Sequence, residues 1–448
     1  MLKAAEGSSN QPLTRRRIAA DVNKLSNADR SAHDWYRFVL SYPPHLVRDY
    51  LGQLPGPADR RVLDPFCGTG TTIVECKKVG IASIGVEAHP LSHFASATKI
   101  DWAVDASELE QSAQTIASHA LRQLEAENII DDPSPALIAE MPNFSTLRNL
   151  PPELDKLLLS NSISPLPLHK TLVLRDFIRS LSPARCRSHH LLALAKALVT
   201  NISNLHFGPE VGVGPAKADA PVVSAWLRLV TQMADDLKGL QKLPKVQALI
   251  YHADSRDIGS LIKPNSIDTV ITSPPYPNEK DYTRTTRLET ILLGFIASKK
   301  ELQELKRTMV RSNTRGVYKG DSDHDLVVGH PEIQRIAAAI EARRIELGKT
   351  SGFERLYARV TKLYFGGMAR HLADLRRVLK PNAHLAYVVG DQASYLRIMI
   401  RTGQLLASLA EPLGYEVVNI DLFRTRMATA TREQLREEVV ILRWPGNK

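Results

Sequence analysis

The sequence predicts an α/β fold built around a mostly parallel β-sheet, and three observations indicate it. In residues 60 to 90, an apolar strand, a glycine-bearing turn, an amphipathic helix and a second apolar strand follow one another, which is the pattern of a right-handed βαβ unit. Residues 267 to 271 form another apolar run, which ends abruptly at two prolines because proline cannot donate to a strand ladder. From residue 353 onward, a helical apolar stripe and three further strand-like runs complete the pattern.

The composition is typical of a soluble globular protein. Of the 448 residues, 43% are hydrophobic and 24% are charged, and no stretch approaches the roughly 18 uninterrupted apolar residues of a membrane helix. The N-terminus has charges but no apolar segment behind them, which argues against a secretory signal. Cys67, Cys76 and Cys186 are too few and too scattered for a disulfide framework or a cysteine-rich zinc site, and we expect no metal site. We therefore expect a cytoplasmic protein without membrane contact.

The basic charge favours a polyanionic partner without requiring one. The formal net charge is +10, and an excess of cations lowers the free-energy cost of approaching a phosphate backbone. Clusters of Lys and Arg that suit this purpose occur at residues 15 to 17, 299 to 300, 306 to 307 and 424 to 432. Charge runs are often solvated faces, so a basic protein with no nucleic-acid role remains equally compatible with the charge alone.

The chain divides into three regions by the periodicity of its apolar residues. Residues 1–105 contain the first half of the predicted sheet with its glycine turn, and residues 246–448 contain the second half with its proline turn. Residues 106–245 show helical periodicity broken by proline-rich links, which predicts a helical insert between the two halves. A chain of this length is expected to form more than one lobe.

The turn after the first strand has the features of a nucleoside pocket. Gly68 and Gly70 let a ligand approach the backbone where a Cβ would collide, and Glu87 at the end of the next strand can bind two ribose hydroxyls. The dinucleotide fingerprint needs a third glycine, which is absent at the required spacing after Gly70. This absence, and the proline turn that a nicotinamide site does not explain, disfavour an NAD-dependent oxidoreductase.

Two motifs resemble those of the S-adenosylmethionine-dependent amino-methyltransferases, which methylate cytosine N4 or adenine N6 in DNA. The stretch Asp64-Pro-Phe-Cys-Gly-Thr-Gly70 resembles the D-x-F-x-G-x-G loop of this family, and Ser273-Pro-Pro-Tyr276 resembles its catalytic tetrapeptide at the end of the fourth strand. The resemblance implies a Rossmann-like sheet of seven strands, mostly parallel with a terminal antiparallel strand, and S-adenosylmethionine as the cofactor.

The resemblance also implies a role for individual residues. The catalytic turn would consist of Ser273, Pro274, Pro275 and Tyr276. The cofactor would be bound by Asp64, Pro65, Phe66, Gly68, Gly70, Glu87 and Asp254, with Asp257 as a competitor of Asp254 for the place beside the adenine amino group.

The chemistry of an exocyclic amine explains the residue types of the catalytic turn. The lone pair of such an amine is delocalised into the base, so the nitrogen is a poor nucleophile and must be oriented. Ser273 Oγ and the backbone carbonyl held by Pro274 can accept the amine hydrogens and aim the lone pair at a methyl group. Tyr276 can stack on a base that has left its helix. Because a sulfonium is already an activated leaving group, neither a cysteine nucleophile nor a metal is required.

Several segments are candidates for contact with nucleic acid. The insert lies approximately where some family members carry a recognition domain, although here it precedes the third strand of the sheet. Residues 201 to 214 and nearby Lys217 either face nucleic acid, through Asn204, His206 and Phe207, or dock the insert onto the sheet. The basic, turn-rich stretch from 306 to 325 is expected to be a lid or substrate clamp. Phosphate contacts are expected from Arg284, Arg287, Arg311 and Arg315.

The resemblance favours methylation of cytosine N4 in DNA. Serine at the first catalytic position is associated in the family mainly with cytosine, whereas aspartate or asparagine is associated mainly with adenine N6. The alternatives are adenine N6 methylation of DNA, N-methylation of an RNA base, and a catalytically silent nucleic-acid-binding homologue. Family members commonly serve restriction-modification, so the expected partners are double-stranded DNA and a cognate restriction endonuclease or another defence protein.

Overall fold

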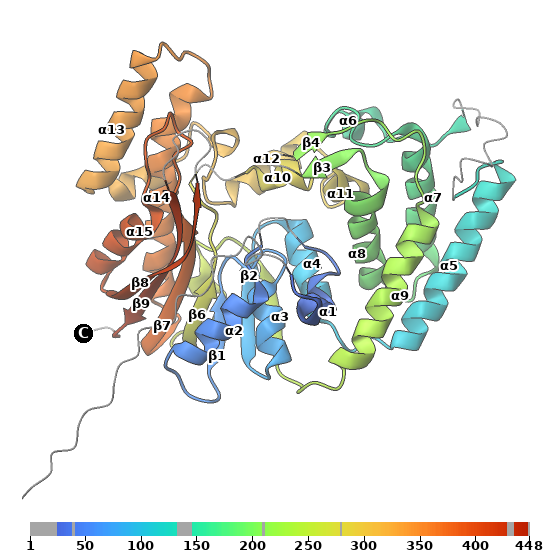
Figure 1. Ribbon diagram of the computed structural model, residues 1–448, viewed down its shortest axis with the longest axis horizontal. Coiled ribbons are helices and arrows are strands. Elements are labelled where there is room, and N and C mark those ends of the chain that lie inside the picture. Colours follow the sequence, from blue (N-terminus) through green and yellow to red (C-terminus); the bar gives the residue numbers. More distant parts are fainter. Residues whose placement is uncertain are drawn as a thin grey trace, which may run out of the picture.

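The computed structural model describes residues 25–37, 41–131, 146–207, 211–277, 280–427 and 434–446 (Figure 1). The basic cluster at residues 15 to 17 lies outside the described residues, as do Asn278 and Glu279 behind the proline turn and residues 428 to 432 of the C-terminal basic cluster. Of the helices in the described ranges, none combines the length and the apolar character that crossing a bilayer requires.

Seven strands form the central sheet. In chain order they are β1 (Arg61–Asp64), β2 (Ala82–Glu87), β5 (Ala248–His252), β6 (Ile267–Thr272), β7 (Leu379–Gly390), β8 (Glu416–Met427) and β9 (Gln434–Trp444). Their order across the sheet is β5-β2-β1-β6-β7-β9-β8. Neighbours from β5 to β7 are parallel, whereas β9 is antiparallel to both β7 and β8. The predicted Rossmann-like sheet, mostly parallel with a terminal antiparallel strand, is confirmed.

Helices cover both faces of this sheet, which is why β6 is buried along its whole length. Val270 and Ile271 are consecutive residues of β6 and belong to different hydrophobic cores, because side chains of a strand alternate between its faces. The core on one face includes α2 (Pro44–Gln53) and part of α3 (Thr71–Lys78). The core on the other face includes α13 (Pro331–Glu346), α14 (Tyr357–Leu375) and α15 (Thr402–Ala410).

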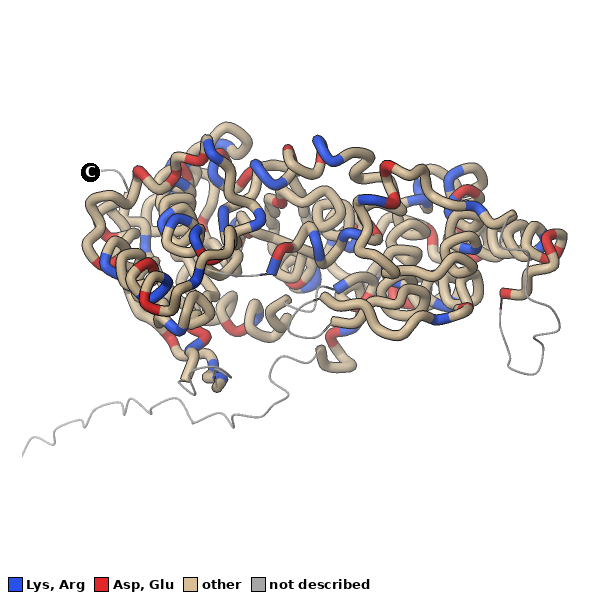
Figure 2. The backbone as a smooth tube through the Cα atoms, turned by 90° about the horizontal axis from the view of Figure 1, so that it is seen from above, with Lys and Arg blue, Asp and Glu red and all other residues tan. Residues whose placement is uncertain are grey.

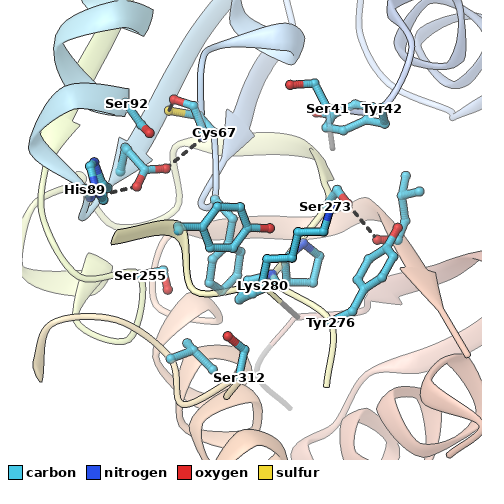
Figure 3. Close-up of a pocket in the computed structure, with 18 of the residues that line it drawn as sticks. Ser41, Tyr42, Cys67, His89, Ser92, Ser255, Ser273, Tyr276, Lys280 and Ser312 are labelled. Carbon is cyan, nitrogen blue, oxygen red and sulfur yellow. Dashed lines mark hydrogen bonds between the residues drawn. The ribbon is translucent and has the colours of Figure 1, made fainter. Parts of the chain in front are cut away.

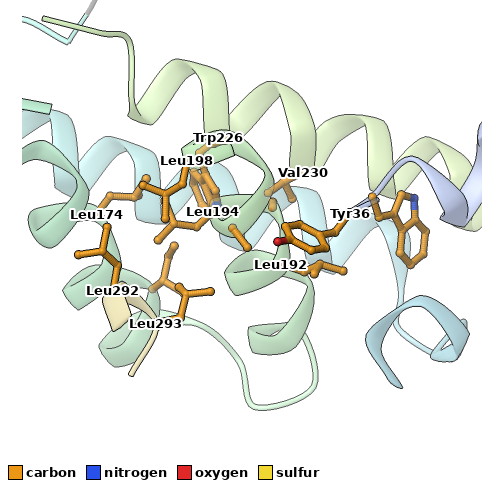
Figure 4. Close-up of a cluster of buried hydrophobic side chains, with 14 of the residues drawn as sticks. Tyr36, Leu174, Leu192, Leu194, Leu198, Trp226, Val230, Leu292 and Leu293 are labelled. Atoms are coloured by element: carbon orange, nitrogen blue, oxygen red, sulfur yellow. The ribbon is translucent and has the colours of Figure 1, made fainter. Parts of the chain in front are cut away.

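A helical region lies beside the sheet domain, between α4 (Pro90–Ile100) and β5 in the chain (Figure 1). Its elements are α5 (Ala106–Ala126), α6 (Pro152–Asp155), α7 (Pro165–Leu181), α8 (Arg187–Ala197), the hairpin of β3 (Leu205–Phe207) and β4 (Val211–Val213), and α9 (Val223–Leu240). Trp226, Leu194 and Leu198 pack in its core (Figure 4). Leu292 and Leu293 join the same core from the end of α11 (Arg287–Leu292), so this region packs directly on the segment that follows the proline turn.

Short elements complete the chain. They are α1 (Arg30–His33), α10 (Tyr282–Thr285), α11 (Arg287–Leu292) and α12 (Lys299–Arg307). The last three follow the proline turn and lie between the sheet and the helical region in Figure 1.

The strand order creates a crevice at the centre of the sheet. β1 and β6 are neighbours, with Leu63 opposite Val270. From β1 the chain crosses to β2 on one side, whereas from β6 it continues to β7 on the other side. Loops that diverge from adjacent parallel strands leave a ligand crevice at the carboxyl ends of those strands. The glycine loop follows β1 and the proline turn follows β6, so both motifs border this crevice.

Candidate active site

A cavity of about 570 Å³ opens at the carboxyl ends of the central strands (Figure 3). This volume is within the usual range for a small-molecule site. Its wall includes, from the sequence-predicted residues, Pro65, Phe66, Gly68, Glu87, Ser273, Pro274, Pro275 and Tyr276. The glycine loop and the proline turn, which are about two hundred residues apart in the chain, therefore share one cavity.

The glycine loop has two left-handed positions with different functions. Gly68 has φ +51° and lines the cavity, and a Cβ placed there would meet no atom within 4 Å. Gly70 has φ +87°, and a Cβ there would lie 3.0 Å from the side chain of Ser96 on α4. Gly70 thus permits close packing of α3 on α4, whereas Gly68 leaves open space beside the backbone.

Glu87 at the end of β2 presents a carboxylate to the cavity. Its Oε2 accepts a hydrogen bond from the backbone N–H of Gly68 at 2.8 Å, and its Oε1 accepts one from the N–H of His89 at 2.7 Å (Figure 3). Burial in the cavity wall raises the pKa of Glu87 to about 7, and the two backbone donors oppose this shift. The carboxylate is therefore held in one orientation and is near its titration point at neutral pH.

Asp64 joins the two loops from beneath instead of lining the cavity. Its Oδ1 accepts hydrogen bonds from the Phe66 N–H at 3.1 Å and from Thr272 Oγ1 at 2.6 Å, and its Oδ2 accepts one from the Tyr42 hydroxyl at 3.1 Å. Burial raises the pKa of the Asp64 carboxyl to about 6. Since Thr272 precedes the proline turn, Asp64 fixes the distance between the glycine loop and that turn.

The hydroxyl of Ser273 has a defined polarity. Ser273 Oγ donates a hydrogen bond to the backbone carbonyl of Val388 on β7 at 3.1 Å (Figure 3). A hydroxyl has one hydrogen and two lone pairs, and a carbonyl can only accept. The hydrogen of Ser273 is therefore directed at β7, and its lone pairs remain for a donor in the cavity.

Tyr276 packs on a glycine at the end of β7. A Cβ placed at Gly390 would lie 2.8 Å from the Tyr276 ring, a distance that real contacts do not show. Gly390 therefore makes room for this ring. The motif marks Tyr276 in the sequence, whereas nothing marks Gly390, because a glycine at a strand end is usually part of a turn.

At the third strand, the structure places Ser255 and not Asp254 in the cavity wall. The Asp254 carboxylate pairs with the guanidinium of Arg256 at 2.6 Å, and the same guanidinium reaches Asp323 at 2.6 Å. Asp257, the competing candidate, pairs with Arg370 at 2.7 Å. Strand β5 ends at His252, so the loop behind it has room to turn the Asp254 carboxylate away from the cavity.

The sequence of the chain is similar to those of known methyltransferases. A family model described as a DNA methylase matches residues 20–94, which include the glycine loop and Glu87. The chain is 27% identical to the Type II methyltransferase M.BsoBI of Geobacillus stearothermophilus over 94% of its own length and 86% of that protein. It is 23% identical to the Type II methyltransferase M.AvaI of Nostoc sp. over 95% of its own length and 89% of that protein.

The chain is an amino-methyltransferase of the N4-cytosine/N6-adenine family. A SAM-dependent methyltransferase of Methanosarcina mazei, a solved structure, aligns with 90% of this chain and 98% of its own at 9% identity, with a TM-score of 0.29. That likeness is too low to inform the fold, which the strand order of the sheet establishes.

The cofactor of this amino-methyltransferase is S-adenosylmethionine, and the residues of the cavity fit it. The open space beside Gly68 admits a ligand against the backbone, and the Glu87 carboxylate can accept the two hydroxyls of a ribose. Thr69 Oγ1 is buried in the same loop without a hydrogen-bond partner, as is Nδ1 of His89 beyond β2. Unpartnered buried polar atoms are costly, which is consistent with a wall built for a polar ligand.

The four arginines expected to contact phosphate differ in their surroundings. Arg311 is buried, and its guanidinium pairs with Asp321 at 2.8 and 2.9 Å and donates to the Lys306 carbonyl at 2.7 Å. Arg287 donates to the backbone carbonyls of Thr283 and Leu157, the latter in the helical region. Both guanidinium groups therefore serve internal contacts. Arg315 is exposed and Arg284 is half-buried, so these two keep a surface position suited to a phosphate.

Charged residues of the described ranges are spread along the molecule. Figure 2 shows lysines and arginines along the whole length of the molecule, interleaved with acidic residues. Within the described residues, the backbone positions of the lysines and arginines therefore single out no one contact surface for DNA.

The two segments with open interpretations are both ordered by internal bonds. Asn204 is buried and donates to the Asn161 carbonyl at 2.9 Å while accepting from the Lys217 N–H at 2.9 Å, so its polar groups are bound within the helical region itself. Its neighbour His206 is exposed on β3. Residues Thr308, Met309, Val310 and Ser312 of the 306 to 325 stretch line the cavity and so form one of its walls.

Sequence reasoning missed the part of the wall that lies far from either motif. Tyr42 precedes α2, Phe423 and Arg424 lie within β8, and Glu437 lies within β9. The Arg424 guanidinium binds both oxygens of Glu437, at 2.6 and 2.8 Å. No local motif brings Phe423, Arg424 and Glu437 together, because pairing of β8 with β9 carries them to the cavity.

Proposed function

We propose that this amino-methyltransferase transfers a methyl group from S-adenosylmethionine to the N4 amine of a cytosine in double-stranded DNA. The observation that carries the proposal is the hydrogen bond from Ser273 Oγ to the Val388 carbonyl. It leaves a neutral hydrogen-bond acceptor at the first position of the catalytic turn, inside the cavity that the glycine loop also lines.

A neutral acceptor suits the amine of cytosine. Ser273 Oγ and the backbone carbonyl held by Pro274 would accept the two amine hydrogens, which draws the nitrogen lone pair out of the ring plane and toward the glycine loop. Tyr276 would stack on the extruded base and replace part of the stacking energy lost on leaving the duplex. Gly390 and the two prolines hold this ring and the turn in place before the base arrives.

Gly68, Glu87 and Ser255 would hold the nucleoside of the cofactor at the other end of the cavity. When bound, S-adenosylmethionine would supply a methyl group on a positively charged sulfur, which can keep the electron pair of the bond that breaks, and the residues of the turn would orient the amine nitrogen toward that methyl carbon. The amine then loses one proton to water. Thr272 and Asp64 keep the two ends at a fixed separation through their 2.6 Å hydrogen bond.

Analysis of nucleosides tests the proposal. Duplex DNA is incubated with the protein and S-adenosylmethionine that carries a deuterated methyl group, and the digested nucleosides are measured by mass spectrometry. We expect labelled N4-methyldeoxycytidine. Labelled N6-methyladenine would show that the target base is adenine and not cytosine. Label in RNA alone would show that the substrate is RNA and not DNA. Absence of label from both nucleic acids, despite binding of the cofactor, would identify a silent homologue.

We also propose that residues 106–245 recognise the target sequence. Arg175 and Arg179 of α7 donate to the carbonyls of Leu292 and Leu293 at the end of α11, at 3.2 and 3.1 Å, and Arg287 donates to the Leu157 carbonyl. These bonds hold the helical region on the segment behind the catalytic turn. Duplexes with 5-iodouracil beside the target base should give photo-crosslinks to peptides from residues 106–245. Crosslinks confined to other regions would contradict this assignment.

A restriction endonuclease of the same site is the proposed biological partner, since two relatives carry the name Type II methyltransferase. DNA from cells that express the protein should resist one endonuclease that cuts DNA from control cells. Long-read sequencing of the same DNA identifies the modified site and so the endonuclease to use. Complete cleavage at a fully modified site would argue against such a pairing.

A further inference from the structure

One buried histidine contacts three elements around the cavity. His371 of α14 has no exposed surface, and its Nδ1 lies 2.8 Å from the backbone carbonyl of Ser255. Its Nε2 lies 2.7 Å from the hydroxyl of Tyr387 on β7, and its ring packs edge-on against Phe66 with 4.8 Å between ring centroids. Ser255 and Phe66 both line the cavity, from the loops behind β5 and β1.

The partners of His371 determine its tautomer. A carbonyl can only accept, so Nδ1 carries the hydrogen and donates it to Ser255. In a neutral imidazole the other nitrogen is then an acceptor, and the Tyr387 hydroxyl must donate to Nε2. Burial lowers the pKa of His371 to about 4, so the ring is neutral at neutral pH. The result is a directed chain of hydrogen bonds from Tyr387 through His371 to the Ser255 carbonyl.

This chain ends close to both halves of the site. Tyr387 is opposite Thr272 in the sheet, and the next residue, Val388, accepts the hydrogen of Ser273. At the other end of the chain of hydrogen bonds, Ser255 belongs to the loop after β5 and lines the cavity where the Asp254 carboxylate was expected. Phe66 lies between Asp64 and Gly68 in the glycine loop, so the imidazole ring supports that loop as well.

We propose that His371 is a positioning residue for S-adenosylmethionine, which holds the loops of Phe66 and Ser255 in the arrangement that binds the cofactor. The inference rests on the proposed function, because it assumes that this cavity binds that cofactor. His371 acts through the two loops and does not touch the reacting atoms.

Binding of the cofactor to the full chain, measured by isothermal titration calorimetry with S-adenosylmethionine and with S-adenosylhomocysteine, tests the proposal. His371→Leu removes both hydrogen bonds and should weaken binding of each ligand at least tenfold. His371→Asn places an amide N–H near the position of Nδ1 and should restore affinity to within about threefold of the wild type. His190→Leu is the matched control, because His190 is another buried, doubly hydrogen-bonded histidine, in the helical region. It should leave both affinities unchanged.

Two tyrosine variants, Tyr387→Phe and Tyr415→Phe, test the same proposal if His371→Leu does not fold. Tyr387→Phe removes the donor to His371 and should weaken cofactor binding at least threefold. Tyr415→Phe removes an equally buried hydroxyl, which donates to the Leu372 carbonyl of the same helix at 2.8 Å, and should not change cofactor affinity.

Melting temperatures of all variants separate positioning from stability. Equal affinities for Tyr387→Phe and Tyr415→Phe, or loss of affinity that follows melting temperature across the whole set, would overturn the positioning role. Failure of the wild type to bind either ligand would instead overturn the proposed function, which distinguishes the two outcomes.

Discussion

Ser273 Oγ donates its hydrogen to the carbonyl of Val388, one strand away, and so keeps its lone pairs for the substrate. Ser273→Ala removes this acceptor and should lower kcat about 10²-fold, the usual effect of losing one hydrogen bond that is strongest in the transition state. Affinity for S-adenosylmethionine should stay unchanged, because Ser273 lies at the other end of the cavity. Single-turnover kinetics and calorimetry measure the two quantities. Equal losses in both would show that the variant distorts the whole site.

Gly390→Ala tests whether the Tyr276 ring must lie on β7. The new Cβ would be 2.8 Å from this ring, so the ring has to leave its position. We expect kcat/KM for DNA to fall at least tenfold while cofactor affinity is retained. Gly239→Ala on α9 is the control, because a Cβ there meets no atom within 4 Å, and alanine in a helix is more favourable than glycine by up to about 1 kcal/mol. Unimpaired methylation by Gly390→Ala would mean that the ring position seen here is unimportant.

Cofactor binding should depend on pH through Glu87, whose pKa burial raises to about 7. Ribose hydroxyls that donate to the carboxylate favour its ionised form, so binding lowers this pKa and releases a proton. The ionised fraction rises about tenfold between pH 6 and pH 8, so affinity should increase about tenfold over that interval and then level off. Glu87→Gln should bind more weakly and without this dependence. Calorimetry in buffers of different ionisation enthalpy detects the proton, and a wild-type affinity that is flat with pH would exclude Glu87 as the ribose ligand.

Arg311 and Arg315 lie four residues apart and should behave in opposite ways. Arg311→Ala removes the charge partner of Asp321, whose side chain is only 11% exposed, and should cost about 3 kcal/mol of unfolding free energy. Arg315 is exposed, so Arg315→Ala should leave stability unchanged and weaken DNA binding. The slope of the logarithm of the binding constant against the logarithm of salt concentration should decrease in magnitude by about the contribution of one phosphate contact. Urea denaturation and binding titrations at several salt concentrations measure these effects. A reduced salt dependence for Arg311→Ala at unchanged stability would reverse the assignment.

The sequence predicted the sheet and the two loops because their residues impose local requirements. Glycines permit left-handed turns and prolines end a buried strand whatever else the chain does, and both motifs lie where they were expected. The roles of Asp64, Arg287 and Arg311 depend on partners that only folding supplies. Asp64 is bound by Thr272, which is 208 residues away, so nothing local distinguishes this structural carboxylate from a cofactor ligand.

The roles of His371 and of the cavity wall from β8 and β9 likewise depend on partners that are distant in the sequence. A lone histidine on an apolar helix is usually part of a core, and nothing local in the sequence distinguishes His371 from such a residue. Its function becomes visible only when α14, β7 and the loop behind β5 are together. Likewise, the Arg424 and Glu437 pair comes to the cavity through strand pairing between β8 and β9.

The most direct test is a crystal structure of the protein with S-adenosylhomocysteine and a duplex that carries the target site. We expect the nucleoside between Gly68 and Ser255, with its sulfur facing the catalytic turn, and an extruded cytosine whose N4 lies about 3 Å from Ser273 Oγ. A nucleoside bound outside this cavity, or a target amine out of reach of Ser273, would contradict the account.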